Sequence, residues 1–344
     1  MNWVIFTARG IRRPLALFFY AILCVSIQAA DASYRLKRLP LPHGTVSSRA
    51  DSINAKGEIL VDALTRRGVA QAQVLRGKKF TTLGSLPGFT NTSGQNISDS
   101  GLVIGSSVNG DSDHATFFYY DGVIHPVTSD QGFVQLFGVT SNNVVLGTIN
   151  SSRPFLATNG VITFLDLPNG FPLSINNAGV LAGTAYVTTN SDSQLRAAFF
   201  VGTNVTFIPT DTIGDGNSVA TALNDAGHVI GVASSNGVNR AFLFRDGVTS
   251  DLGLLEGWNG LYPAAINSRD QIVGFAVNGP DSSVAPFLWE AGELINLSQF
   301  VRKHQGTIAA GQSIDINDAG TIVTTLNKNG RTRAVLLTPK TPRH

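Results

Sequence analysis

Residues 218–252, SVATALNDAGHVIGVASSNGVNRAFLFRDGVTSDL, contain four short apolar or β-branched runs, at 219–223, 229–233, 241–244 and 248–252. Asn224-Asp225-Ala226-Gly227 separates the first two runs, and it suits a tight turn because Asn can bond its own backbone and Gly accepts a positive φ. Asp246-Gly247 gives a second hairpin signal between the last two runs. The segment therefore predicts an antiparallel meander, whose strands we call a, b, c and d.

The same unit recurs along the chain. The Asn that begins its first turn, or a Ser or Thr in its place, returns every 36 to 50 residues, at Asn54, Ser98, Thr140, Asn176, Asn224, Asn267 and Asn317. Seven copies with a mean spacing of about 44 residues match the period of a propeller with four strands per blade. Seven residues after this position, strand b carries Gly105, Gly147, Gly183, Gly231 and Gly274, and a Gly inside a strand indicates a bulge or a close backbone approach. We therefore expect an all-β fold, a seven-bladed β-propeller of four-stranded antiparallel blades.

The two ends of the repeat region complement each other. Residues 34–42, YRLKRLPLP, read as a strand d with no blade before it, whereas the last copy ends after strand c near residue 339. Pairing of residues 34–39 with residues 333–337 would complete the seventh blade and leave no long open sheet edge. We expect this pairing to close the ring.

The repeats resemble the HAF family of probable extracellular repeats, whose pattern runs Ile-Asn, two residues, Gly, then Val-Gly, Ala-Phe-Leu-Trp and Asp-Leu-Gly. The stretches that carry the likeness are LNDAGHVIG, INDAGTIV, INNAGVLAG, INSRDQIVG, AFLFRDGVTSDLG and PFLWEAG, and the pattern is partial at Ser98, Thr140 and the first blade. The resemblance covers nearly all of residues 33–344. It implies an exported repeat protein and assigns no biochemical activity.

Residues 1–32 have the features of an export signal. Arg9, Arg12 and Arg13 precede an apolar run at 15–27, and Ala30-Asp31-Ala32 offers cleavage after Ala30 or Ala32. The run is shorter than the roughly 20 residues that span a bilayer, so we expect no membrane span after signal removal. Arg12-Arg13 leaves a twin-arginine signal open as an alternative.

The composition sets further limits. Cys24 is the only cysteine, so the mature chain would form no disulfide, and each blade must gain its stability from its neighbours. The formal net charge of +2 argues against nucleic acid as a partner. No sequence motif indicates catalytic residues, a cofactor or a metal site, and we expect a monomer.

Successive turns of a meander alternate between the two ends of a blade. The tight a–b and c–d turns share one face, which we call the turn face, and the variable b–c and d–a connections share the other, the loop face. Loops on a rigid scaffold usually carry binding residues, so we expect a ligand site on the loop face near the axis. Trp258, Asn259 and Tyr262 are candidates, because an aromatic ring beside amides suits a sugar; the alternative is that Trp258 fills space in its loop.

Basic residues form a second candidate group. Arg153, Arg240 and Arg333 each lie one residue before strand c of their blades, and Arg196 and His114 lie one position further back. Together they would form an incomplete basic ring for an anionic glycan or surface polymer. The alternative is that these charges keep strand starts soluble and in register.

Two groups of residues offer the oxygen ligands that calcium takes: Asn109, Asp111 and Asp113, and Asp211, Asp215 and Asn217. Neither has the spacing of a known calcium loop, and solvated turn carboxylates are the favoured interpretation.

The function that fits these features is an exported module that binds a carbohydrate or protein ligand outside the cytoplasm, in the periplasm, at the cell surface or beyond. A propeller hydrolase or lyase acting on an extracellular polymer is the first alternative, and a structural surface or matrix component is the second. A cluster of carboxylates with shifted protonation near the axis would favour the enzyme.

Overall fold

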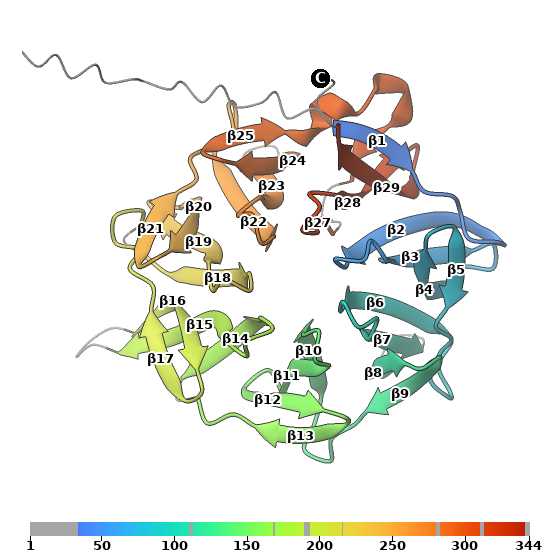
Figure 1. Cartoon of the computed structure of the whole chain (residues 1–344), viewed down its shortest axis with the longest axis horizontal. Helices are drawn as coiled ribbons and strands as arrows, with labels where there is room; N and C mark the ends of the chain where they lie inside the picture. The colour runs from blue at the N-terminus through green and yellow to red at the C-terminus, as the bar shows by residue number, and fades with distance from the viewer. Residues whose placement is uncertain are drawn as a thin grey trace, which may run out of the picture. The chain divides into compact units, whose positions relative to one another are not determined.

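A computed structural model describes residues 34–340, apart from 110–112, 168, 189–192, 215, 280–282 and 310–312. The predicted export signal, residues 1–32, lies outside the described residues, as do Asp111 and Asp215. Seven antiparallel sheets are arranged as blades around an axis (Figure 1), which confirms the predicted seven-bladed propeller.

In the first six blades, the strands pair in the order in which they follow one another along the chain. Blade one contains β2 (Thr45–Ile53), β3 (Ile59–Thr65), β4 (Ala70–Arg76) and β5 (Lys79–Thr82). Blade two contains β6 (Asn91–Ile97), β7 (Val103–Asn109), β8 (Asp113–Tyr120) and β9 (Val123–Val127). Blade three contains β10 (Val134–Val139), β11 (Val144–Ile149), β12 (Arg153–Thr158) and β13 (Val161–Phe164).

The next three blades repeat this meander. Blade four contains β14 (Gly170–Ile175), β15 (Leu181–Thr188), β16 (Ser193–Val201) and β17 (Asn204–Phe207). Blade five contains β18 (Ser218–Leu223), β19 (Val229–Ser235), β20 (Val238–Arg245) and β21 (Val248–Asp251). Blade six contains β22 (Gly260–Ile266), β23 (Ile272–Asn278), β24 (Ser283–Glu290) and β25 (Glu293–Asn296).

Blade seven joins the two ends of the propeller. Its strand a is divided into β26 (Thr307–Ile308) and β27 (Asp315–Ile316), which both pair with β28 (Ile322–Lys328). Strand c is β29 (Arg331–Pro339), and β1 (Tyr34–Arg38) is the outermost strand. In the antiparallel register, Leu36 lies opposite Leu337, and the backbone N–H of Leu39 donates to the carbonyl of Ala334 at 2.9 Å. The predicted closure is therefore confirmed. Two short 3₁₀ turns, η1 (Leu297–Phe300) and η2 (Lys303–Gln305), connect blades six and seven.

The hydrophobic core is divided among the gaps between blades. In the gap between blades seven and one, Val323 and Ala334 pack with Ile53 and Ile59, and Phe242 of blade five packs in the gap toward blade four. Fully burying one such aliphatic or aromatic side chain contributes about 1.5–3 kcal/mol. Each blade therefore depends on both neighbours, as expected for a repeat too small to be stable alone.

The glycine of strand b lies opposite a bulge in strand a. Gly231 faces Ala220, where the register of β18 shifts, and a Cβ at Gly231 would lie 2.1 Å from the carbonyl oxygen of Val219 and 2.5 Å from the ring of Phe242. The bulge expected from this Gly is therefore present, and the aromatic ring of strand c occupies the space that a side chain would need.

Candidate functional site

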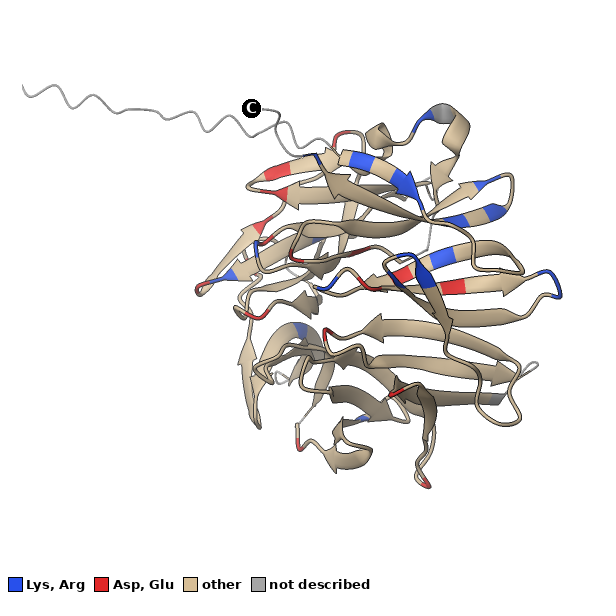
Figure 2. Cartoon of the chain, turned by 45° about the vertical axis from the view of Figure 1, so that its right-hand side comes forward, with Lys and Arg blue, Asp and Glu red and all other residues tan. Residues whose placement is uncertain are grey.

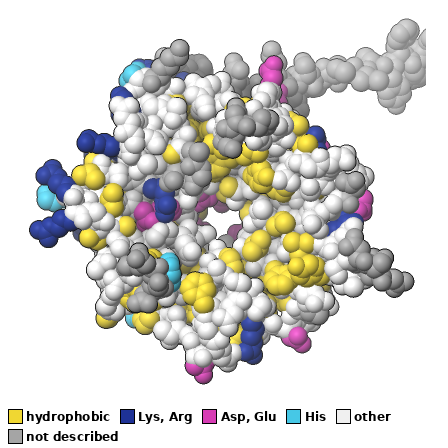
Figure 3. Space-filling model, turned by 180° about the vertical axis from the view of Figure 1, so that it is seen from behind, with side chains coloured by type: hydrophobic (Ala, Val, Ile, Leu, Met, Phe, Trp, Pro, Cys, Tyr) yellow, Lys and Arg dark blue, Asp and Glu magenta, His cyan; other side chains and the backbone are white. Residues whose placement is uncertain are grey.

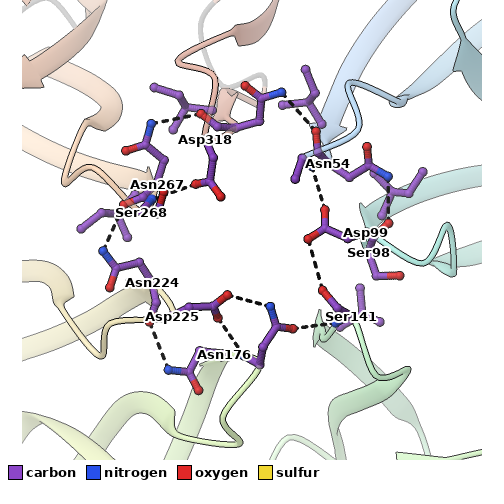
Figure 4. A pocket seen from close by; sticks show the side chains of 18 of the residues that line it. Asn54, Ser98, Asp99, Ser141, Asn176, Asn224, Asp225, Asn267, Ser268 and Asp318 are labelled. Atoms are coloured by element: carbon purple, nitrogen blue, oxygen red, sulfur yellow. Dashed lines mark hydrogen bonds between the residues drawn. The ribbon is translucent and has the colours of Figure 1, made fainter.

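On the turn face, the recurring Asn links neighbouring blades around the axis (Figure 4). Its Oδ1 accepts the backbone N–H four residues later, as from His228 to Asn224 at 3.0 Å, which closes the a–b turn. Its Nδ2 donates to the backbone carbonyl of the corresponding residue in the next blade. These bonds, of 2.9 to 3.1 Å, run from Asn54 to Ser98, Asn176 to Asn224, Asn224 to Asn267, Asn267 to Asn317 and Asn317 to Asn54.

The two replacements of this Asn preserve only half of its bonding. The hydroxyls of Ser98 and Thr140 accept the N–H groups of Leu102 and Val144 at 3.1 and 3.0 Å, so the turn itself is closed. A hydroxyl lacks the length and the second donor of an amide, and among the described residues neither hydroxyl donates to the turn carbonyl of the next blade. The sequence pattern predicted the turn but missed the bond between blades. Asp or Ser could also form such a turn, so the recurrence of Asn itself was the signal that could have revealed this bond.

The residue after this Asn adds a second layer of bonds. Asp99, Asn177, Asp225 and Asp318 each accept a backbone N–H from the preceding blade, at 2.6 to 2.9 Å. These side chains and the Asn layer line a polar axial pocket of about 190 Å³ on the turn face. Most polar groups that line this pocket already bond one another across the blade boundaries. The lining side chains therefore hold the blades together.

On the loop face, exposed aromatic side chains gather near the axis. Phe133, Tyr186 and Tyr262 are 47, 45 and 41% exposed, large fractions for such side chains. The rings of Phe171 and Tyr186 meet edge to face with centroids 5.8 Å apart, and those of His114 and Phe133 do so at 6.4 Å. Figure 3 looks onto this face and shows hydrophobic side chains around a central hollow.

The three residues of the predicted aromatic site differ in their surroundings. Tyr262 in β22 is exposed, and its hydroxyl accepts a hydrogen bond from Nδ2 of Asn239 in the neighbouring blade. Asn259 uses its Oδ1 to accept the N–H of Gly279 at 3.0 Å. Trp258 is half-buried and packs against the core between blades five and six. Its indole therefore fills space in its loop, which was the alternative to ligand binding.

The four arginines of the predicted basic ring belong to four separate blades and have unlike partners. The guanidinium of Arg153 lies 3.5 Å from the ring centroid of Phe164 and bonds Gln131. Arg240 forms an ion pair with Asp251 at 2.6 Å. Arg196 pairs with Asp211 at 2.8 Å, whereas Arg333 lies in a groove beside Arg38.

A cluster of carboxylates lies where blade one meets blade two. Arg49 of β2 pairs with Asp51 at 2.7 Å and with Asp62 of β3 at 2.8 Å. Asp62 also accepts the N–H of Gly94 in blade two at 2.9 Å. Burial raises the pKa of both carboxyls despite Arg49, and for Asp51 the charge of Asp62 adds to the effect. Among the described residues, Oδ2 of Asp51 has no hydrogen-bond partner.

The described part of the chain contains neither a cluster of metal-binding side chains nor a membrane-spanning helix. No group of three or more His, Cys, Asp or Glu side chains there lies close enough to hold a metal ion. No helix there is both long and apolar enough to cross a membrane.

The comparisons with known proteins agree with the fold. No family model and no curated protein matches the sequence, so membership of the HAF family stays a prediction. Oligogalacturonate lyase from Vibrio parahaemolyticus has a TM-score of 0.58 at 12% identity, over 90% of this chain and 94% of that one. A puromycin-hydrolyzing peptidase from Mycobacterium tuberculosis has a TM-score of 0.56 at 13% identity, over 89% of this chain and 55% of that one. YCF48 bound to D1 peptide has a TM-score of 0.52 at 12% identity, over 90 and 97%. At these identities, the similarity defines the class of protein as a β-propeller.

Proposed function

We propose that the chain is an exported binding module whose loop face takes a carbohydrate or protein ligand. The export signal predicted from residues 1–32 and the likeness to the HAF family support the location. A propeller fold alone does not define a function, so the proposal depends on the character of the loop face.

The exposed aromatic side chains around the axis carry this proposal. Phe133, Tyr186 and Tyr262 leave apolar surface in water, and Figure 3 shows hydrophobic side chains of this face around the central hollow, where apolar exposure marks an interaction site. Tyrosine offers a flat apolar ring together with a hydroxyl, which suits both a sugar ring and a peptide. The partly buried Asn239 beside Tyr262 adds amide groups that can bond ligand hydroxyls or a peptide backbone.

A binding screen of the chain from residue 33 tests the proposal. We expect a ligand from a glycan array or a peptide library whose affinity falls about tenfold, or about 1.4 kcal/mol, in Tyr262→Ala. Tyr120→Ala is the matched control, because Tyr120 is 38% exposed but lies at the c–d turn on the turn face. Equal losses in both variants, or no ligand in either screen, would contradict the proposal.

Cleavage of a polymer is a second candidate function, and the raised pKa of Asp51 and Asp62 favours it. The oligogalacturonate lyase among the similar structures fits this alternative at the level of the fold. However, the Asp51 side chain is 3% exposed and Asp62 is engaged by Arg49, Ser93 and Gly94. Depolymerisation of a uronate polymer that is abolished in Asp62→Asn while folding is preserved would establish the enzyme and displace the binding module.

A further inference from the structure

A basic groove lies at the seam where blades seven and one close the ring. It has a volume of about 360 Å³, and its charged lining consists of Arg38, Arg66, Lys328, Arg331 and Arg333. These residues come from β1, the b–c turn of blade one and the β28–β29 hairpin, so the groove opens on the loop face. Figure 2 shows Lys and Arg along β1 and on the segments beside it.

The groove concentrates positive charge without neutralising it. The whole chain has 25 Lys and Arg against 23 Asp and Glu, yet five cations and no carboxylate line this groove. Elsewhere Arg49, Arg76, Arg196, Arg240 and Arg245 each lie 2.6 to 3.1 Å from a carboxylate oxygen. Among the described residues, none of the five groove cations forms an ion pair.

Neighbouring backbone groups hold two of the five cations in place. Arg38 donates to the carbonyl of Gln305 at 2.5 Å, and Lys328 donates to the carbonyl of His304 at 2.8 Å. Half-buried Arg333 has its pKa lowered by burial and by the nearby charge of Arg38. Like charges held together repel one another, and a bound anion would relieve that repulsion.

We propose that this groove binds an anionic polysaccharide, with guanidinium groups on its acidic groups and polar side chains on its hydroxyls. Thr45, Thr332 and Gln305 add hydroxyl and amide groups to the lining. The lining includes three aliphatic side chains, Leu41, Val46 and Leu326, but no aromatic ring, whereas peptide-binding sites usually anchor on aromatic side chains. This inference goes beyond the proposed function, because its residues are separate from the aromatic side chains near the axis.

Binding of two polyanions to the chain from residue 33 tests the groove. The probes are polygalacturonate, which carries carboxylates, and heparin, which also carries sulfates, with neutral dextran and poly-L-glutamate for comparison. The test variant is Arg66→Glu with Arg331→Glu, because both side chains are exposed at the groove. The control, Arg67→Glu with Lys79→Glu, makes the same change in net charge at exposed positions outside the lining.

We expect salt-sensitive binding of at least one of the two polysaccharides, weakened tenfold or more in the groove variant and less than twofold in the control. Whichever polysaccharide binds more tightly identifies the acidic group that the groove prefers. Equal weakening in both variants, no binding of either polysaccharide, or tighter binding of poly-L-glutamate would overturn the inference. Tyr262→Ala separates the two proposals, since it should leave this binding unchanged.

Discussion

At the scale of single residues, one amide side chain forms both the turn and the junction between blades. The acceptor of Asn224 closes its own turn on His228, and its donor reaches the carbonyl of Asn267 in the next blade. Ser98 and Thr140 show what remains when the side chain makes only the accepted bond that closes the turn. The two functions can therefore be separated by substitution.

Asn224→Ser should lose the two bonds that Nδ2 donates to blade six, to the carbonyl of Asn267 and to Oδ1 of Asp270, while keeping the turn, and Asn224→Ala should lose the turn bond as well. One net hydrogen bond contributes about 0.5–1.5 kcal/mol, so we expect losses of about 2 and 3 kcal/mol in the free energy of unfolding. Denaturant titration measures both. Thr140→Asn is the reverse change and should add stability of up to about 1 kcal/mol, because the new amide can reach the carbonyl of Asn176. Equal losses in the two Asn224 variants would contradict the idea that the acceptor closes the turn and the donor joins the blades.

The buried carboxylates make a second residue-scale prediction, about pH. Asp51 has a folded pKa above the roughly 3.9 expected in the unfolded chain. Between those two values the folded state binds more protons, so the free energy of unfolding should fall as pH rises from about 4 toward the raised pKa. Each pH unit between the two pKa values corresponds to about 1.4 kcal/mol. Asp51→Asn should make the free energy of unfolding depend less on pH in this range. If the free energies of the two proteins, measured by denaturant titration, change in parallel between pH 4 and 7, the prediction is wrong.

At the scale of the strand, a bulge, a glycine and an aromatic ring form one unit. Gly105, Gly147, Gly231 and Gly274 face Phe117, Phe155, Phe242 and Phe287 across the b–c pairing. The first and last blades have Val61 and Thr324 at this position, and their strand c carries Gln73 and Val335 opposite. Where a side chain returns, in the first and last blades, no ring faces it. In blade four, Gly183 faces Ala198 rather than a ring, and Gly is kept there because a Cβ would lie 2.1 Å from the carbonyl oxygen of Phe171.

Gly231→Ala should therefore destabilise the propeller by about 1–3 kcal/mol, because its Cβ would overlap the Val219 carbonyl and the Phe242 ring. Gly279→Ala is the control, since its Cβ would meet only the Asn259 amide at 3.9 Å. Thermal unfolding of both variants measures the difference. Similar melting temperatures for the two would contradict the packing argument.

At the scale of the whole molecule, blade number and closure were predictable from sequence because they follow from local turns and a repeated period. The bond that the turn Asn makes to the next blade and the basic groove were not, since both depend on which residues of different blades face each other. Arg38 and Arg333 lie almost 300 positions apart in the chain, and only the β1–β29 pairing brings them together. Among the predicted site residues, Tyr262 is exposed near the axis and Arg333 lies in the groove, whereas Trp258 is partly buried against the core.

The closed ring supports both proposed binding surfaces, and a cross-link between its first and last strands tests it most directly. Arg35 lies opposite Thr338, and antiparallel partners have Cα separations of about 4.5–5.5 Å, within disulfide range. The chain from residue 33 lacks native cysteines, so Arg35→Cys with Thr338→Cys should form one intramolecular disulfide, detected by mass spectrometry after oxidation. The control variant, Arg35→Cys with Arg331→Cys, should form no disulfide, because position 331 lies roughly 23 Å along β29 from position 338. Equal cross-linking in both variants, or none in the first, would contradict the closed seven-bladed ring.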